Sequence, residues 1–137
     1  MTDNLLTNFI QIDSFEKQFL NNKSNFPFDH WVFEEFFNLD VAKKLEGEFP
    51  AYDDKVWYEW NNPLEIKKAR NDWNSFPPLT YKVINALNSN NFLNLLKKFT
   101  GVKELYSDSG LNGAGWHIHP SGGHNNVHLD YSIHPKL

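Results

Sequence analysis

The end of the chain, LNGAGWHIHPSGGHNNVHLDYSIHPKL (111–137), differs in pattern from everything before it. Five of the seven glycines lie between Gly110 and Gly123, and five of the six histidines lie between His117 and His134. Apolar and polar residues begin to alternate here, in GWHIHP (115–120) and NNVHLDYSI (125–133), as is typical of strands. The stretch therefore predicts a β region at the end of the chain.

The preceding residues are patterned as helices. NLDVAKKLEGEFP (38–50) carries apolar residues at helical spacing, with Asn38 as the expected N-cap. PPLTYKVINALNS (77–89) begins with prolines, and NNFLNLLKKFTG (90–101) ends at a glycine suited to a C-terminal cap. These three stretches predict helices.

Two aromatic stretches, 26–37 and 53–62, predict strands or extended segments, and residues 1–25 predict a polar segment with a loosely attached helix near Phe15 and Phe19. The expected fold class is thus α+β, with N-terminal helices packed on the first strands of a sheet. The expected organisation is a segment over 1–25 followed by a single domain portion over 26–137.

The amino-acid composition argues against several classes of function. A net charge of −4 and a single arginine, Arg70, argue against nucleic-acid binding. The absence of cysteine excludes disulfides, thiolate metal sites and cysteine nucleophiles, and fits a cytoplasmic protein. No apolar run approaches the ~20 residues of a membrane span, and no signal peptide is evident, so no membrane partner is expected.

VHLDYSI (127–133) carries the chemistry that stands out. In a strand, residues i and i+2 share a face, so His128 and Asp130 would project together. One imidazole and one carboxylate, joined by a distant second histidine, make the facial triad that holds Fe(II) with three positions open. A His-x-Asp pair alone is common by chance. The nearby Gly-Gly pair and the preceding aromatic-His strand strengthen its interpretation as part of a metal site.

Three ordered segments carry a family resemblance: PFDHWVFEEFF with AKKLEGEFP, LNSNNFLNLLKKFTGV, and LNGAGWHIHPSGGHNNVHLDYSIHPKL. Together they resemble the N-terminal half of Fe(II)/2-oxoglutarate-dependent oxygenases of the prolyl 4-hydroxylase-like group. The resemblance implies a double-stranded β-helix (jelly roll) and a dioxygenase that hydroxylates a prolyl, amino-acid or other small or peptidyl substrate. It implies His128 and Asp130 as iron ligands, His119 near 2-oxoglutarate, and ascorbate as an optional cofactor.

The sequence departs from that family after Asp130. The distal histidine and the Arg or Lys that pairs with 2-oxoglutarate come several dozen residues later in the family, whereas His134 and Lys136 lie too close to serve. We therefore expect an oxygenase portion truncated before the distal ligand, inactive alone and completed by a missing C-terminal half.

Two other interpretations remain open. A cupin-like, non-catalytic module could bind Zn(II) or Ni(II) through His117, His119, His124, His128 and Asp130. Alternatively, the chain is a degenerate remnant without chemistry, and its unpaired strand edges would then make it poorly soluble.

Overall fold

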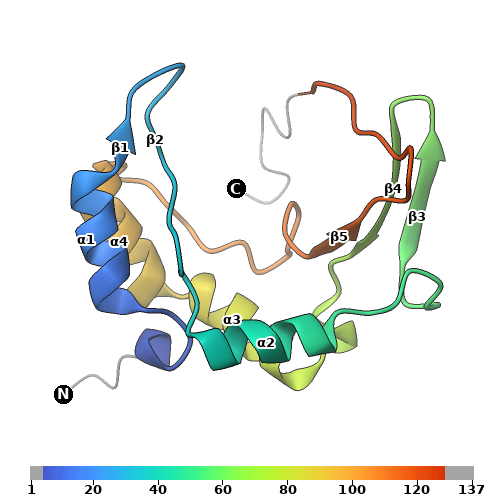
Figure 1. Cartoon of the computed structure of the whole chain (residues 1–137), viewed down its shortest axis with the longest axis horizontal. Helices are drawn as coiled ribbons and strands as arrows, with labels where there is room; N and C mark the ends of the chain where they lie inside the picture. Colours follow the sequence, from blue (N-terminus) through green and yellow to red (C-terminus); the bar gives the residue numbers. More distant parts are fainter. Residues whose placement is uncertain (1–4, 129–137) are drawn as a thin grey trace. The chain divides into compact units, whose positions relative to one another are not determined.

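The computed structural model describes residues 5–128, and these residues form two compact units (Figure 1). Unit 1 consists of the residues up to Glu48 together with Pro77–Ser109. Unit 2 consists of Phe49–Phe76 together with the residues from Gly110 onward. The boundary expected at residue 25 lies inside unit 1.

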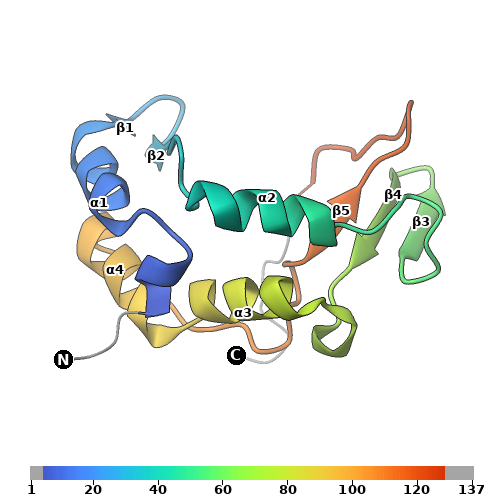
Figure 2. The ribbon, with the colours of Figure 1, turned by 60° about the horizontal axis from the view of Figure 1, so that its bottom comes forward.

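Unit 1 is helical, with a small two-stranded ribbon. Figure 2 shows α2 and α3 running side by side, as do α1 and α4. Its elements are η1 (Leu5–Asn8), α1 (Ile12–Asn21), β1 (Lys23–Ser24), β2 (His30–Trp31), α2 (Leu39–Glu48), α3 (Pro78–Leu87) and α4 (Asn90–Thr100). The helices predicted over 38–50, 77–89 and 90–101 are confirmed.

Aromatic rings form much of the core of unit 1. Phe15 is 2% exposed, and its ring packs within 6.5 Å of the rings of Phe19, Phe33, Phe36, Phe92 and Phe99. Phe19 also stacks on Phe99 at 4.9 Å and contacts Trp31 at 4.5 Å. Helix α1 is therefore an integral part of the core, and the expectation that it is loosely attached is wrong.

The helix ends follow local chemistry. Ser89 Oγ accepts a hydrogen bond from the backbone N–H of Phe92 at the start of α4, and Gly101 ends that helix in the left-handed conformation, with φ +73°. Asn38 precedes α2, but its side-chain amide donates to the carbonyl of Thr7 at 3.1 Å. The backbone carbonyl of Asn38 accepts from the N–H of Ala42 at 3.0 Å, so Asn38 occupies the N-cap position of α2.

Unit 2 is built on a three-stranded antiparallel sheet in the order β3 (Tyr58–Asn62), β4 (Glu65–Arg70) and β5 (Trp116–Ile118). Asn62 makes the β3–β4 hairpin, because its Oδ1 accepts from the backbone N–H groups of Leu64 and Glu65. Strand β5 pairs with β4 across a long sequence separation, so that Arg70 lies opposite Trp116.

The α+β class is confirmed, but residues 5–128 contain neither a jelly roll nor a double-stranded β-helix. The strand expected over 26–37 is reduced to His30–Trp31, because the aromatic residues after it turn into the helical core instead of a sheet. In the stretch 127–133, neither Val127 nor His128 is in a strand, and the remaining residues lie outside the described part.

Candidate functional site

One face of the unit 2 sheet carries most of the polar and aromatic side chains that form a pocket. Directly opposed residues in antiparallel strands project to the same side. Tyr58 therefore shares a face with Ala69 and His117, and Trp60 shares it with Lys67. This arrangement collects a phenol, an indole, an ammonium and an imidazole over three strands.

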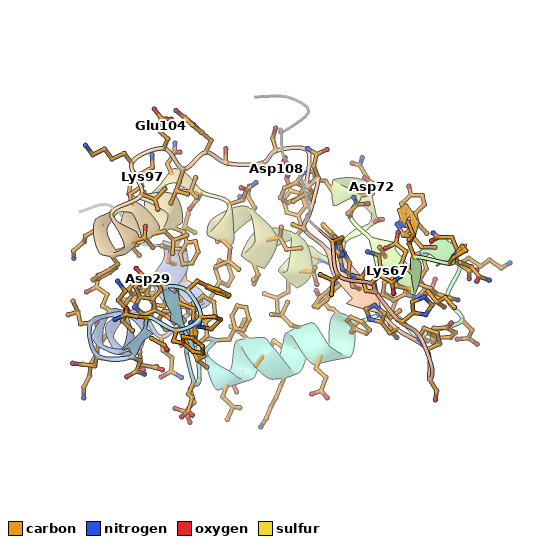
Figure 3. The ribbon with its side chains drawn as sticks, turned by 90° about the horizontal axis from the view of Figure 1, so that it is seen from above. Asp29, Lys67, Asp72, Lys97, Glu104 and Asp108 are labelled. Atoms are coloured by element: carbon orange, nitrogen blue, oxygen red, sulfur yellow. The ribbon has the colours of Figure 1, made fainter. Side chains whose placement is uncertain are left out.

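A pocket of about 570 Å³ lies over this face. Lys67 is labelled in Figure 3, among the side chains of the β3–β4–β5 sheet. We call this pocket the sheet pocket. It is lined by Tyr58, Trp60, Glu65, Lys67, Ala69, Asn71, Asn112, Gly113, Ala114, His117 and His128.

The chain reaches His128 through a loop inserted in the edge strand beside β4. Ile118 lies opposite Lys68 and Asn125 lies opposite Glu65, so the six residues 119–124 on the edge correspond to only two, 66–67, on β4. The extra residues form a turn closed by the N–H of Gly123 donating to the carbonyl of Pro120 at 2.9 Å, with positive φ at Gly122. The Gly-Gly pair thus shapes this loop.

After the loop, the edge continues along β4 and brings His128 to the pocket. The N–H of Ile66 donates to the carbonyl of His124, and the N–H of Asn126 donates to that of Leu64. The His128 Nδ1–H donates to the carbonyl of Asn126 at 2.6 Å. A carbonyl only accepts, so Nδ1 carries a proton.

A histidine bonded in this way binds a metal through its other ring nitrogen, Nε2. Ligating histidines usually donate their second ring N–H to a carbonyl or carboxylate. Residues 5–128 bring together no group of three His, Asp or Glu side chains able to hold a metal ion. Asp130, the expected second ligand, lies outside the described residues.

The sheet pocket contains a lysine and a histidine whose pKa is lowered. Lys67 Nζ is 2.7 Å from Glu65 Oε2, and both side chains are at most about a quarter exposed. Partial removal from water lowers the pKa of His117, and the charges of Lys67 and His119 lower it further, against an opposing effect of Glu65. The lowered pKa favours the neutral form of His117, and Lys67, paired with Glu65, is the cation of the pocket.

The other predicted residues lie around this pocket or outside the described part. His119 follows β5, is exposed and does not line the pocket, so its expected role beside 2-oxoglutarate remains a prediction. His124 Nε2 donates to the carbonyl of Pro63 at 3.3 Å. His134 and Lys136 lie outside the described residues.

The sequence interpretation missed several lining residues because it missed β4. Tyr58, Trp60, Glu65 and Lys67 reach the sheet pocket only through the β3–β4 hairpin. The available signal was the Asn-Pro-Leu turn at 62–64 between an aromatic strand and EIKKAR (65–70), which is short and strand-like.

Comparison with known proteins adds no family: no protein-family model, curated protein or solved structure matches this chain. Within residues 5–128, no helix has both the length and the apolar content needed to cross a membrane.

Proposed function

We propose that the chain is part of an Fe(II)- and 2-oxoglutarate-dependent dioxygenase, with the iron held at the sheet pocket by His128 and Asp130. The observation that supports this most is His128 itself, which lines the pocket with its Nδ1–H bonded to a backbone carbonyl. Asp130 follows two residues later in the sequence, so the two side chains start close enough along the backbone to share one ion.

The lining residues suit the reactants. When bound, iron and 2-oxoglutarate would supply O₂-dependent hydroxylation, with one oxygen atom ending in succinate and the other on the substrate. Lys67 offers a positive charge that would attract a dicarboxylate, and it would exchange part of its interaction with Glu65 for that ligand. The exposed rings of Tyr58 and Trp60 provide apolar area for a small or peptidyl substrate.

Metal binding tests the proposal without requiring turnover. Fe(II) under anaerobic conditions, or Mn(II) as its redox-stable substitute, is titrated into the chain by calorimetry, with and without 2-oxoglutarate. His128→Ala and Asp130→Ala should each weaken binding by at least tenfold, because each removes one ligand. His30→Ala, a histidine of unit 1, is the matched control and should leave the affinity unchanged.

Two results would contradict the proposal: unchanged metal affinity in both ligand variants, or metal binding that 2-oxoglutarate does not strengthen. Visible charge-transfer absorption of an Fe(II)–2-oxoglutarate chelate offers an independent readout. Its absence in a protein that binds Fe(II) tightly would argue against the dioxygenase assignment.

A non-catalytic metal-binding module is the second candidate, and one observation favours it. His117 lines the same pocket as His128, so two imidazoles are available there. In this case Zn(II) or Ni(II) should bind with one-to-one stoichiometry, His117→Ala should weaken binding as much as His128→Ala, and 2-oxoglutarate should have no effect. The His117 variant therefore separates the two proposals.

A further inference from the structure

Arg70, the only arginine of the chain, lies at the end of β4 and is 8% exposed. Its Nε donates to Ser75 Oγ at 3.0 Å. Within residues 5–128, no carboxylate forms an ion pair with Arg70, since all the ion pairs there involve lysines. A largely buried arginine without a counter-ion is uncommon, because charged groups held partly away from water are normally paired or bind a ligand.

A second buried donor lies directly across the strand pair. Trp116 is the residue opposite Arg70 in the β4–β5 ladder, so the two side chains project from the same face of the sheet. Trp116 Nε1 is buried and finds no hydrogen-bond acceptor among the described residues. Most buried polar groups are satisfied, and an orphaned N–H indicates an acceptor that is still to be identified.

This face is the opposite one from the sheet pocket. His117 lies between Trp116 and Ile118 and projects to the other side, and Lys67 and Ala69 do the same on β4. The surroundings of Trp116 are aromatic: Phe49 contacts Trp116 edge-on at 4.9 Å and Trp57 at 5.6 Å. The two donors therefore form a feature separate from the histidines.

The backbone is shaped to bring β5 against the end of β4. Gly115 has φ +142°, a conformation that side chains rarely adopt, and a Cβ there would collide with the carbonyl of Arg70. Glycine at this position lets Trp116 pair with Arg70 at the last residue of β4. The juxtaposition of the two donors thus depends on a specific local geometry.

We propose that Arg70 and Trp116 form a binding site for a small monocarboxylate. With Nε bonded to Ser75, the two terminal nitrogens of the guanidinium present the planar fork that matches a carboxylate. The indole N–H adds a neutral donor. One positive charge among aromatic rings balances one negative charge, which favours a carboxylate over a phosphate dianion. This site is independent of the proposed iron site.

The chain is well suited to a direct test by ¹H–¹⁵N NMR. Its single arginine gives one Nε–H signal, and its five tryptophans give five indole signals, of which Trp116→Phe identifies the relevant one. Sodium acetate is titrated in, with sodium chloride as the ionic-strength control and phosphate as the competing anion. We expect saturable shifts of both the Arg70 and the Trp116 signals with acetate alone.

Variants make the result specific. Trp116→Phe should weaken acetate binding, read at the Arg70 signal, by about tenfold, because one donor is lost. Arg70→Gln should abolish saturation at the indole signal. Trp31→Phe, in unit 1, is the matched control and should leave the affinity unchanged. Because Trp116→Phe keeps an aromatic ring against Phe49, it provides a test even if Arg70→Gln unfolds.

Three outcomes would overturn the proposal. Equal shifts with chloride would show that the signals respond only to ionic strength. Saturation with phosphate but not with acetate would show that the site binds a different ligand. Insensitivity of both signals to acetate, with magnetisation transfer from water to the indole N–H, would show that an ordered water satisfies Trp116.

Discussion

Glu48 ties helix α2 to the start of α3, and removing its carboxylate should destabilise unit 1. The carboxylate accepts from the N–H of Leu79 at 3.0 Å, the N–H of Thr80 at 2.7 Å and Thr80 Oγ1 at 2.8 Å. Pro78, the first residue of α3, has no N–H. Glu48 therefore satisfies the donors that the first helical turn leaves without partners.

The size of the effect follows from these contacts. A hydrogen bond to a charged group contributes about 1.5–3 kcal/mol, but neighbouring bonds are not additive. Thr80 is 1% exposed, so its hydroxyl and N–H would lose their partner away from water. We expect Glu48→Ala to lower the free energy of unfolding by about 3 kcal/mol, or the melting temperature by about 10 °C. Glu48→Gln, which keeps one oxygen, should cost about 1–2 kcal/mol.

The same contacts give a pH signature. Burial alone would raise the pKa of Glu48, but the hydrogen bonds from Thr80 and Leu79 outweigh it and lower the pKa below 4.5. The stabilisation is therefore complete above pH 4.5 and is lost as the pH falls through the lower pKa of the folded state. Glu48→Gln should lose less stability on acidification than the unchanged chain.

Urea unfolding followed by circular dichroism at 222 nm, at neutral and acidic pH, measures both effects. Glu46→Ala and Glu46→Gln are the controls, since Glu46 is an exposed residue of the same helix. A Glu48→Ala cost no larger than that of Glu46→Ala, or an unchanged acid response in Glu48→Gln, would refute the reasoning.

Three further predictions concern single positions. Gly115→Ala should cost about 2–3 kcal/mol and speed hydrogen exchange of the β5 amides, because the new Cβ meets the Arg70 carbonyl; unchanged exchange would contradict this. Gly101→Ala should lower stability in urea by about 1 kcal/mol at the left-handed cap of α4, whereas Gly47→Ala inside α2 should raise it by about 0.5–1 kcal/mol. His117 has a lowered pKa, so its contribution to the free energy of unfolding is complete above pH 6.5. That contribution is lost as the pH falls from 6.5 through the lower pKa of the folded state. His117→Gln should therefore flatten the melting temperature between about pH 7 and pH 5, and an unchanged slope would exclude this.

The helices could be predicted because their signals are local. Residues 77–101 contain a proline start, an apolar stripe in each helix, Ser89 between the helices and Gly101 at the end, and the structure uses each of these features. The residues that pack on those apolar stripes could not be predicted from local signals. Phe33 and Phe36 lie in the stretch 26–37 that predicted a strand, yet they contact Phe15 from an irregular segment, because ring burial outweighed local strand preference.

The sheet pocket could be predicted only in part, because its residues meet through pairing between distant segments. Strand β4 pairs with β3 through a hairpin and with β5 across more than 40 residues of sequence, and nothing local specifies the second register. The histidine-rich stretch indicated that chemistry gathers near the end of the chain. It did not indicate Lys67 or Trp60, which enter the pocket from the hairpin.

Strand alternation alone would also have placed His128 wrongly. His117 faces the pocket from opposite Ala69, and Asn125 lies opposite Glu65, which lines it too. Counting on from Asn125 in a regular strand would turn His128 to the opposite face. The segment after Asn126 does not continue as a strand, because it has no further strand to pair with. Strand β4 begins at Glu65, and the last backbone hydrogen bond joins Asn126 to Leu64. The chain then bends at Val127, and His128 lines the pocket from beyond the sheet, held by the carbonyl of Asn126.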